Sequence, residues 1–191
     1  MAFAFKLLGH ANCRVCRVFF GIQNIRANLR DYFFPRGRMN SYERYSRFIV
    51  RSVDHIFKNF LQDASVEEVY ESQTSSRDHR VAIEFRGTIE GEIIINMPAR
   101  TLDSITKKML PDANAKALKQ YHADIAGEIA NLITGTFANQ LQFLKHDVRL
   151  LPPEIDDDPI SLKALYDNIN LSFTSVYGGF DIDLYYRDTR E

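Results

Sequence analysis

The sequence predicts an α/β fold of the α+β type, in which an antiparallel-rich sheet packs against long helices. Three observations predict it. Apolar residues recur at helical spacing in two long segments, residues 42–61 and 114–143. The segments after each helix alternate apolar and polar residues, as strands with one buried face do. The order of a helix, a short strand, a polar loop and a glycine-containing hairpin occurs twice, which indicates a pseudo-twofold domain of duplicated α-β-β-β units.

The first unit is expected to contain one long helix and three strands. Its segments are, in order, a helix over residues 42–61, a short strand over 66–71, a polar loop over 72–78, a strand through 81–85 and a strand over 92–97. Glu90-Gly91 predicts a tight turn between the last two strands. Pro98 ends the final strand and is suited to begin a further helix, which Pro111 closes.

The second unit is expected to repeat this order. Its segments are a helical stretch over residues 114–143, a strand over 147–151, a loop over 152–159, a strand over 170–177 and a strand over 181–187. Gly178-Gly179 predicts the turn between the last two strands. We expect the two units to pack as one domain around a shared core.

The two leading helices can be aligned without gaps. The apolar positions Ile49, Val53, Ile56 and Phe57 then fall on Ile125, Ile129, Leu132 and Ile133. The same alignment sets Ser52, His55 and Asn59 at the positions of Glu128, Asn131 and Gly135. We therefore expect the polar pattern described next to occur in the second helix only.

Four residues of the second helix form the most informative pattern in the chain. Asp124, Glu128, Asn131 and Gly135 are spaced by four, three and four residues, so they return to one face of a helix, within an arc of roughly 60°. The opposite face is apolar and suited to dock on a core. A carboxylate and a carboxamide would thus lie one turn apart on an exposed surface, beside a glycine that allows close approach. This arrangement is either a solvated polar face or a site.

Composition excludes several classes of function. The net charge is −1, but residues 1–38 carry +6 and the remaining residues −7. An acidic body argues against nucleic-acid binding. No run of about 18 apolar residues predicts a membrane span, and the first 21 residues make a poor secretory signal because charged residues interrupt them. A body without cysteine fits a reducing cytoplasm, so we expect a cytoplasmic protein.

The basic leader, residues 1–38, is expected to lie outside the domain. Its His10, Cys13 and Cys16 could form half of a metal site, but no second pair of ligands with suitable spacing follows. A redox Cys-x-x-Cys motif would need a thioredoxin-like context that the sequence lacks. We expect an accessory extension, or upstream sequence from an early start codon, with the domain spanning residues 39–191.

The pattern Asp124, Glu128, Asn131 and Gly135 resembles the signature of the CheC/CheX family of response-regulator phosphatases of bacterial chemotaxis. The hairpin sequence of residues 86–92 and the duplicated architecture resemble the same family. The resemblance spans about residues 39–188 and is greatest to CheX, because CheC-type proteins typically carry the signature in both helices. It implies a CheC/CheX-like fold and a homodimer joined through sheet edges.

The resemblance also implies an activity and roles for individual residues. The substrate would be the phosphoaspartate of a CheY-like regulator, and the enzyme would terminate a chemotaxis or two-component signal. Asn131 would hold the attacking water and Glu128 would pair with the regulator's lysine. Asp124 and Gly135 are the supporting residues. Asp124 either contacts the partner or only solvates the helix, of which solvation is favoured, and Gly135 either allows close approach of the partner or serves packing. Mg²⁺ would be held by the regulator, so no cofactor is expected on this chain. Phosphoryl transfer needs mainly positioning and charge complementarity, which these side chains can supply.

Other polar residues near the second helix are candidates for function. His122, Lys145 and His146 flank the second helix off the signature face, and we expect ordinary surface side chains there rather than proton carriers. The acidic run of residues 154–158 is expected to be a solvated loop rather than a partner-binding patch. The alternative functions are a non-catalytic CheX-like adaptor that binds a signalling partner and a structural oligomer subunit.

Overall fold

The computed structural model describes residues 40–72, 79–112, 114–155 and 166–189. All described residues lie in one compact unit, Asn40–Glu191. The expected boundary between the leader and a domain over residues 39–191 stays a prediction, and the metal or redox candidates of the leader lie outside the described residues.

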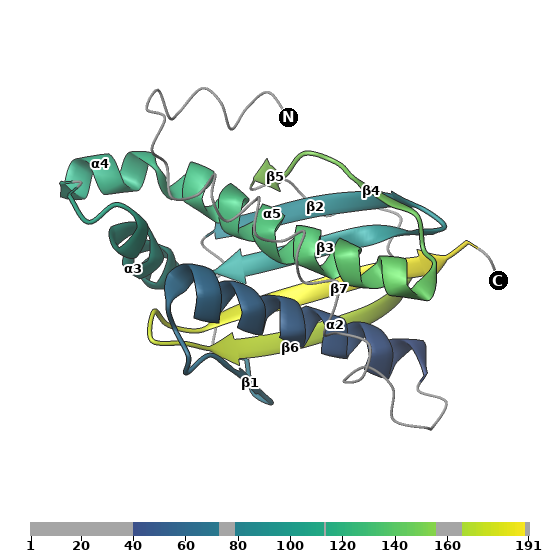
Figure 1. Ribbon diagram of the computed structural model, residues 1–191. Helices are drawn as coiled ribbons and strands as arrows, with labels where there is room; N and C mark the ends of the chain where they lie inside the picture. Colours follow the sequence, from purple (N-terminus) through teal and green to yellow (C-terminus); the bar gives the residue numbers. More distant parts are fainter. Residues whose placement is uncertain (1–39, 73–78, 113, 156–165, 190–191) are drawn as a thin grey trace. The chain divides into compact units, whose positions relative to one another are not determined.

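The compact unit Asn40–Glu191 contains long helices and an antiparallel sheet (Figure 1). The helices are α2 (Ser41–Ile56), α3 (Ala99–Met109), α4 (Ala115–Gln120) and α5 (His122–Leu141), with a π-helical turn at Phe57–Leu61 and a 3₁₀ turn at Gln142–Leu144. The strands are β1 (Glu67–Val69), β2 (His79–Gly87), β3 (Ile89–Met97), β4 (Val148–Leu150), β5 (Glu154–Ile155), β6 (Asp167–Thr174) and β7 (Phe180–Asp188). The predicted fold class is confirmed.

The sheet has the symmetry expected of a duplicated unit. Its strand order is β1-β6-β7-β3-β2-β4, with β5 pairing β2 beside this path. Exchange of the two α-β-β-β repeats maps β1 onto β4, β2 onto β6 and β3 onto β7, so the strand order is the same when read from either edge of the sheet. The pseudo-twofold axis therefore passes between the central strands β3 and β7. Helices α2 and α5 lie side by side over one face of the sheet (Figure 1).

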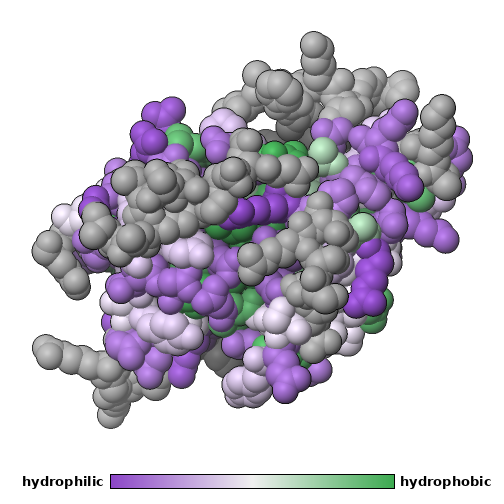
Figure 2. Space-filling model, turned by 180° about the vertical axis from the view of Figure 1, so that it is seen from behind, coloured by the Kyte–Doolittle hydropathy of each residue, from purple (hydrophilic) through white to green (hydrophobic). Residues whose placement is uncertain are grey.

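Alternating residues of the strands form the apolar layer beneath the helices. Ile83 pairs with Ile93, and Ile93 pairs with Leu184, and all three are buried. Phe57 of the π-helical turn stacks on Phe180 of β7, with ring centroids 4.9 Å apart. The intervening residues point to the opposite face of the sheet. Seen from that side, the coloured surface is mostly hydrophilic (Figure 2).

The first hairpin turns at a different place from the one predicted. The chain reverses at Gly87-Thr88, where Gly87 has a φ of +153°, so the prediction of a turn at Glu90-Gly91 is wrong. Gly91 lies inside β3, where a Cβ atom would come within 2.0 Å of the Tyr185 carbonyl oxygen. This glycine is required by the close approach of two strands, a reason that a local sequence pattern does not reveal.

Other boundaries also shift. The segment expected as a loop over residues 152–159 contains the short strand β5, and β6 begins three residues before the expected strand. The single helical stretch expected over 114–143 is divided into α4, α5 and the 3₁₀ turn. The acidic run is described only at Glu154 and Ile155, where Glu154 is exposed.

The two long helices correspond at a shift of 77 residues, from Tyr45 to His122. Seven buried positions of the first helical segment then meet seven buried positions of α5. They pair as Tyr45 with His122, Phe48 with Ile125, Ile49 with Ala126, Ser52 with Ile129, Val53 with Ala130, Ile56 with Ile133 and Phe57 with Thr134. The predicted alignment is therefore wrong by one residue. At the shift of 77 residues, the counterparts of Asp124, Glu128, Asn131 and Gly135 are Arg47, Arg51, Asp54 and Lys58.

Candidate functional site

The candidate site is the outward face of α5. Isoleucine, leucine and alanine residues at helical spacing bury the inner face of this helix against the sheet and α2. Asp124 lies in the first turn, where a carboxylate is favoured by the helix dipole. Asp124 and Asn131 are exposed, and Glu128 and Gly135 are half-buried. The four predicted residues thus share one accessible stripe along about three turns of the helix.

Glu128 carries a negative charge that no cation among the described residues neutralises. No hydrogen bond or ion pair connects its carboxylate to another of the described residues. Burial among its neighbours raises the pKa of this carboxyl above its ordinary value. A half-buried carboxylate without a cation favours binding of one from outside, because the incoming charge offsets the lost solvation. Glu128 is therefore suited to receive an ammonium or guanidinium group.

Asn131 presents an unengaged carboxamide one turn after Glu128. It is exposed and makes no hydrogen bond to the described residues. A carboxamide can both donate to and accept from a water molecule, and it carries no charge that would repel phosphoryl oxygens. Its position beside the Glu128 carboxylate allows one ligand to contact both side chains.

Gly135 leaves room above the stripe. A Cβ atom built at this glycine would meet no atom within 4 Å. By contrast, a Cβ at Gly127, on the flank of the same helix, would lie 3.7 Å from Pro153. Packing within the described residues therefore does not require glycine at position 135. The absence of a side chain instead keeps the end of the stripe flat, which suits close approach by another molecule.

The flanking histidines are buried, so the prediction that they are ordinary surface side chains is wrong for both. His122 is 8% exposed because it falls on the inner face of α5, and its Nε2 lies 2.9 Å from Asp103 Oδ1 without hydrogen-bond alignment. His146 is 3% exposed. It follows Lys145, whose left-handed backbone turns the chain inward. Only Lys145 is exposed, as predicted.

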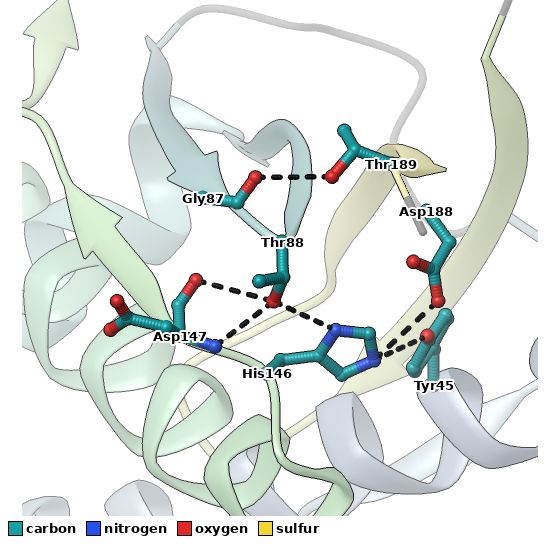
Figure 3. Close-up of polar contacts among 7 residues, drawn as sticks. All are labelled: Tyr45, Gly87, Thr88, His146, Asp147, Asp188 and Thr189. Carbon is teal, nitrogen blue, oxygen red and sulfur yellow. Dashed lines mark hydrogen bonds and ion pairs between the residues drawn. The ribbon is translucent and has the colours of Figure 1, made fainter. Parts of the chain in front are cut away.

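His146 joins three other segments of the chain (Figure 3). Its Nε2 lies 3.2 Å from the Tyr45 hydroxyl on α2 and 3.8 Å from Asp188 Oδ2 at the end of β7. Its Nδ1 lies 3.3 Å from the Thr88 hydroxyl in the turn between β2 and β3. This network fastens the end of α5 to the sheet and lies on the inner side of the helix layer, away from the candidate site.

The described residues contain neither a metal cluster nor a membrane-spanning helix. Within residues 40–72, 79–112, 114–155 and 166–189, no group of three or more His, Cys, Asp or Glu side chains could hold a metal ion. In the same part of the chain, no helix is long and apolar enough to cross a membrane. The basic residues of α2 that align with the candidate site were not predicted from the sequence. The four-residue step from Arg47 to Arg51 is present in the sequence, but the predicted alignment set Ser52, not Arg51, at the position of Glu128.

Comparison with known proteins identifies relatives of this arrangement. The family model of the chemotaxis phosphatase CheX matches residues 80–162, a segment that includes the candidate site. Comparison with curated protein sequences found no match.

Solved structures share the fold at low sequence identity. The CheX-CheY-BeF3-Mg²⁺ complex from Borrelia burgdorferi matches with a TM-score of 0.63 at 19% identity, over 75% of this chain and 97% of that chain. CheX from Vibrio vulnificus matches with a TM-score of 0.63 at 21% identity, over 78% and 100% of the two chains. CheX from Desulfovibrio desulfuricans matches with a TM-score of 0.60 at 16% identity, over 75% and 99%.

Proposed function

The chain belongs to the CheC/CheX family, and from this premise we propose that it is a phosphatase of a CheY-like response regulator. The reaction is hydrolysis of the regulator's phosphoaspartate. Water attacks phosphorus, the bond between phosphorus and the aspartyl oxygen breaks, and the regulator regains a free carboxylate as phosphate leaves. The physiological effect is to end a chemotaxis or two-component signal. The similar CheX from Borrelia burgdorferi has been solved in complex with CheY, which supports a CheY-related role.

Asn131 is assigned the positioning of the attacking water. Its carboxamide is exposed and unengaged by the described residues, so it can hold a water by one hydrogen bond while leaving a lone pair directed at phosphorus. Positioning is the main contribution a protein can make to phosphoryl transfer, because the reaction needs little covalent assistance.

Glu128 is assigned the pairing with a basic side chain of the regulator. The carboxylate has no cationic partner among the described residues, and its partial burial makes a new partner favourable. Such a pair would fix the distance between the regulator and Asn131. Asp124 and Gly135 have supporting roles, the first as a further polar contact and the second as the open end of the docking surface.

A single observation carries this proposal. A carboxylate and a carboxamide, neither engaged by another of the described residues, lie with an open glycine on one accessible stripe of a helix whose inner face is fixed to the core of a CheX-like fold. Mg²⁺ belongs to the regulator in this proposal. Homodimerisation through sheet edges and a cytoplasmic location are further parts of the proposal.

The alternative is a non-catalytic adaptor of the same fold, which would bind a regulator without hydrolysis. Two measurements separate the possibilities. CheY-like regulators are phosphorylated with a small phosphodonor, and phosphate release is followed with and without this protein. Asn131→Ala is then compared with the unchanged protein. We expect stimulation by the wild type, a loss of roughly 100-fold or more in the variant, and nearly equal affinity of both for the regulator. Binding without any stimulation would favour the adaptor.

A further inference from the structure

The outward face of α2 is basic where that of α5 is acidic. We call Arg47 and Arg51 of α2, with Lys58 of the π-helical turn that follows it, the cationic face. Asp54 lies on the same stripe and pairs with Lys58. Arg47 and Lys58 are exposed and Arg51 is half-buried. At the shift of 77 residues that superimposes the buried positions, these residues correspond to Asp124, Glu128 and Gly135 of the candidate site. The cationic face and the site therefore point away from the sheet on the same side of the protein.

The two helices are held in direct contact. The Gln140 side-chain amide of α5 donates to the Phe48 carbonyl, at 3.0 Å, and to the Ser52 hydroxyl, at 2.8 Å. Phe48 and Ser52 flank the cationic face on the side that meets α5. Figure 1 shows the helices lying together over the sheet. The cationic face and the candidate site are thus neighbouring strips of one surface.

The charges of the two strips are of opposite sign. Helix α5 contains no lysine or arginine, and its only acidic residues are Asp124 and Glu128. Lys58, in the π-helical turn after α2, pairs with Asp54 at 2.6 Å, but Arg47 of α2 has no acidic partner among the described residues. Burial and the nearby positive charge of Arg47 lower the pKa of Arg51. The two guanidinium groups therefore share one region of positive potential.

A regulator bound at Asn131 would also cover α2. Packed helices lie about 8–10 Å apart, whereas a domain of about 100 residues has a radius of gyration of roughly 13 Å. A site that holds a phosphoaspartate and a divalent cation is surrounded by acidic side chains, because carboxylates and phosphate oxygens are the ligands that Mg²⁺ prefers. An acidic surface placed over α5 would therefore extend onto Arg47 and Arg51.

We propose that the cationic face is an electrostatic docking surface for the acidic rim around the regulator's phosphorylation site. This inference rests on the proposed function and adds a division of labour between the repeats. The second helix carries the residues that act on the phosphoryl group, and the first attracts and orients the partner. Opposite charges on adjacent strips also favour one orientation of the partner, since rotation would set like charges together.

The experiment compares Arg47→Glu, Arg51→Gln, the charge-preserving Arg47→Lys and the control Arg100→Glu. Arg100 is exposed on α3, so its reversal changes the net charge equally at another surface. Dephosphorylation kinetics are measured from low to high salt, along with the Kd for a regulator loaded with Mg²⁺ and beryllofluoride. We expect Arg47→Glu to raise KM and Kd roughly three- to tenfold at low salt with kcat unchanged. The difference should shrink near 1 M salt, where the Debye length is about 3 Å.

Arg51→Gln should act in the same direction, while Arg47→Lys and Arg100→Glu should match the wild type. Thermal unfolding of each variant establishes that the fold is intact. An unchanged Kd in Arg47→Glu would overturn the inference, as would an equal effect of Arg100→Glu. A change of oligomeric state without a change in Kd would assign the cationic face to contact between copies of the chain and would overturn it as well.

The outcomes distinguish this inference from the proposed function. If the wild type binds regulators but hydrolyses none, the catalytic proposal fails and the Kd values alone decide the docking proposal. If hydrolysis occurs and Arg47→Glu is without effect, the catalytic proposal stands and the docking proposal fails. If the wild type binds no regulator, both are overturned.

Discussion

Asp63 offers the sharpest test of how the fold is held together. It directly follows Gln62, whose left-handed backbone ends the first helical segment, and its side chain is 2% exposed. Asp63 Oδ1 accepts from the Ser65 backbone N–H at 2.8 Å and from the Ser65 hydroxyl at 2.7 Å. Its Oδ2 accepts from the Val176 backbone N–H at 3.0 Å, in the turn between β6 and β7. The carboxylate therefore connects the end of the first helical segment to the β6–β7 hairpin, which belongs to the second repeat.

We expect Asp63→Ala to lower the free energy of unfolding by roughly 2–4 kcal/mol. A hydrogen bond to a charged group contributes about 1.5–3 kcal/mol, and three such bonds are removed. Ser65 and Val176 are exposed, so water can replace part of what is lost. For a protein of this size, each kcal/mol lowers Tm by about 2–4 °C. The expected fall in Tm is about 4–16 °C.

The same residue predicts a dependence on pH. Burial alone would raise the pKa of Asp63, but the hydrogen bonds from Ser65 and Val176 outweigh it and lower the pKa below its ordinary value. A carboxyl group whose pKa is lowered by folding stabilises the protein fully above the unfolded pKa of about 4. That stability is lost as the pH falls towards the folded pKa. The advantage of wild type over Asp63→Asn should therefore narrow below about pH 4.

Urea unfolding followed by circular dichroism, repeated between pH 3 and 7, measures both effects. The proposed phosphatase activity, measured per folded molecule, should be unchanged, because Asp63 lies outside the candidate site. A loss below about 0.5 kcal/mol in Asp63→Ala, within the range of ordinary surface substitutions, would refute the assignment of these hydrogen bonds as a major tie. So would a difference between wild type and Asp63→Asn that stays constant with pH.

Three further results are expected. Because burial raises the pKa of Glu128, the charge of this carboxylate opposes folding above the unfolded pKa. Glu128→Gln should therefore raise Tm at pH 7 but not at acid pH, and it should raise the KM for the regulator. A lower Tm of the variant at pH 7 would contradict the reasoning. Gly91→Ala should lower the free energy of unfolding in urea by several kcal/mol, since the new Cβ would come within 2.0 Å of the Tyr185 carbonyl oxygen. An unchanged free energy of unfolding would show that β3 and β7 can separate. Ser52→Ala should lower the free energy of unfolding by about 1 kcal/mol, because it removes the hydrogen bond from Gln140, and kcat should be unchanged. A lower kcat in a fully folded variant would place Ser52 in the site.

The sequence predicted the elements of the fold because their signals are local. Helical and alternating periodicity reports which residues of a segment share a face, and burial later requires only that the apolar face meet another. This is why Ile125 and Ile129 were expected in the core and are buried, and why Asp124 and Asn131 were expected at the surface and are exposed.

Long-range contacts decided the features that the sequence analysis missed. Gly91 looked like a turn residue, but its constraint is the carbonyl of Tyr185 on another strand. His146 was expected at the surface because histidine is polar. The left-handed backbone of Lys145, which turns His146 towards the core, could not be predicted from the sequence. The alignment of the two helices was wrong by one because the predicted alignment also set apolar residues on apolar residues. The buried Ser52, held by Gln140, has a counterpart in the apolar Ile129.

The sequence by itself determined the identity and spacing of Asp124, Glu128, Asn131 and Gly135, since helix geometry alone brings these positions to one face. Only the tertiary structure decided that Glu128 is half-buried and without a cation among the described residues, because desolvation and pairing depend on neighbours from other segments. It also decided that Arg47 and Arg51 of the first helix flank this face. The spacing of residues along a helix is determined by its own sequence, whereas the residues that lie beside its exposed face depend on which helix packs next to it.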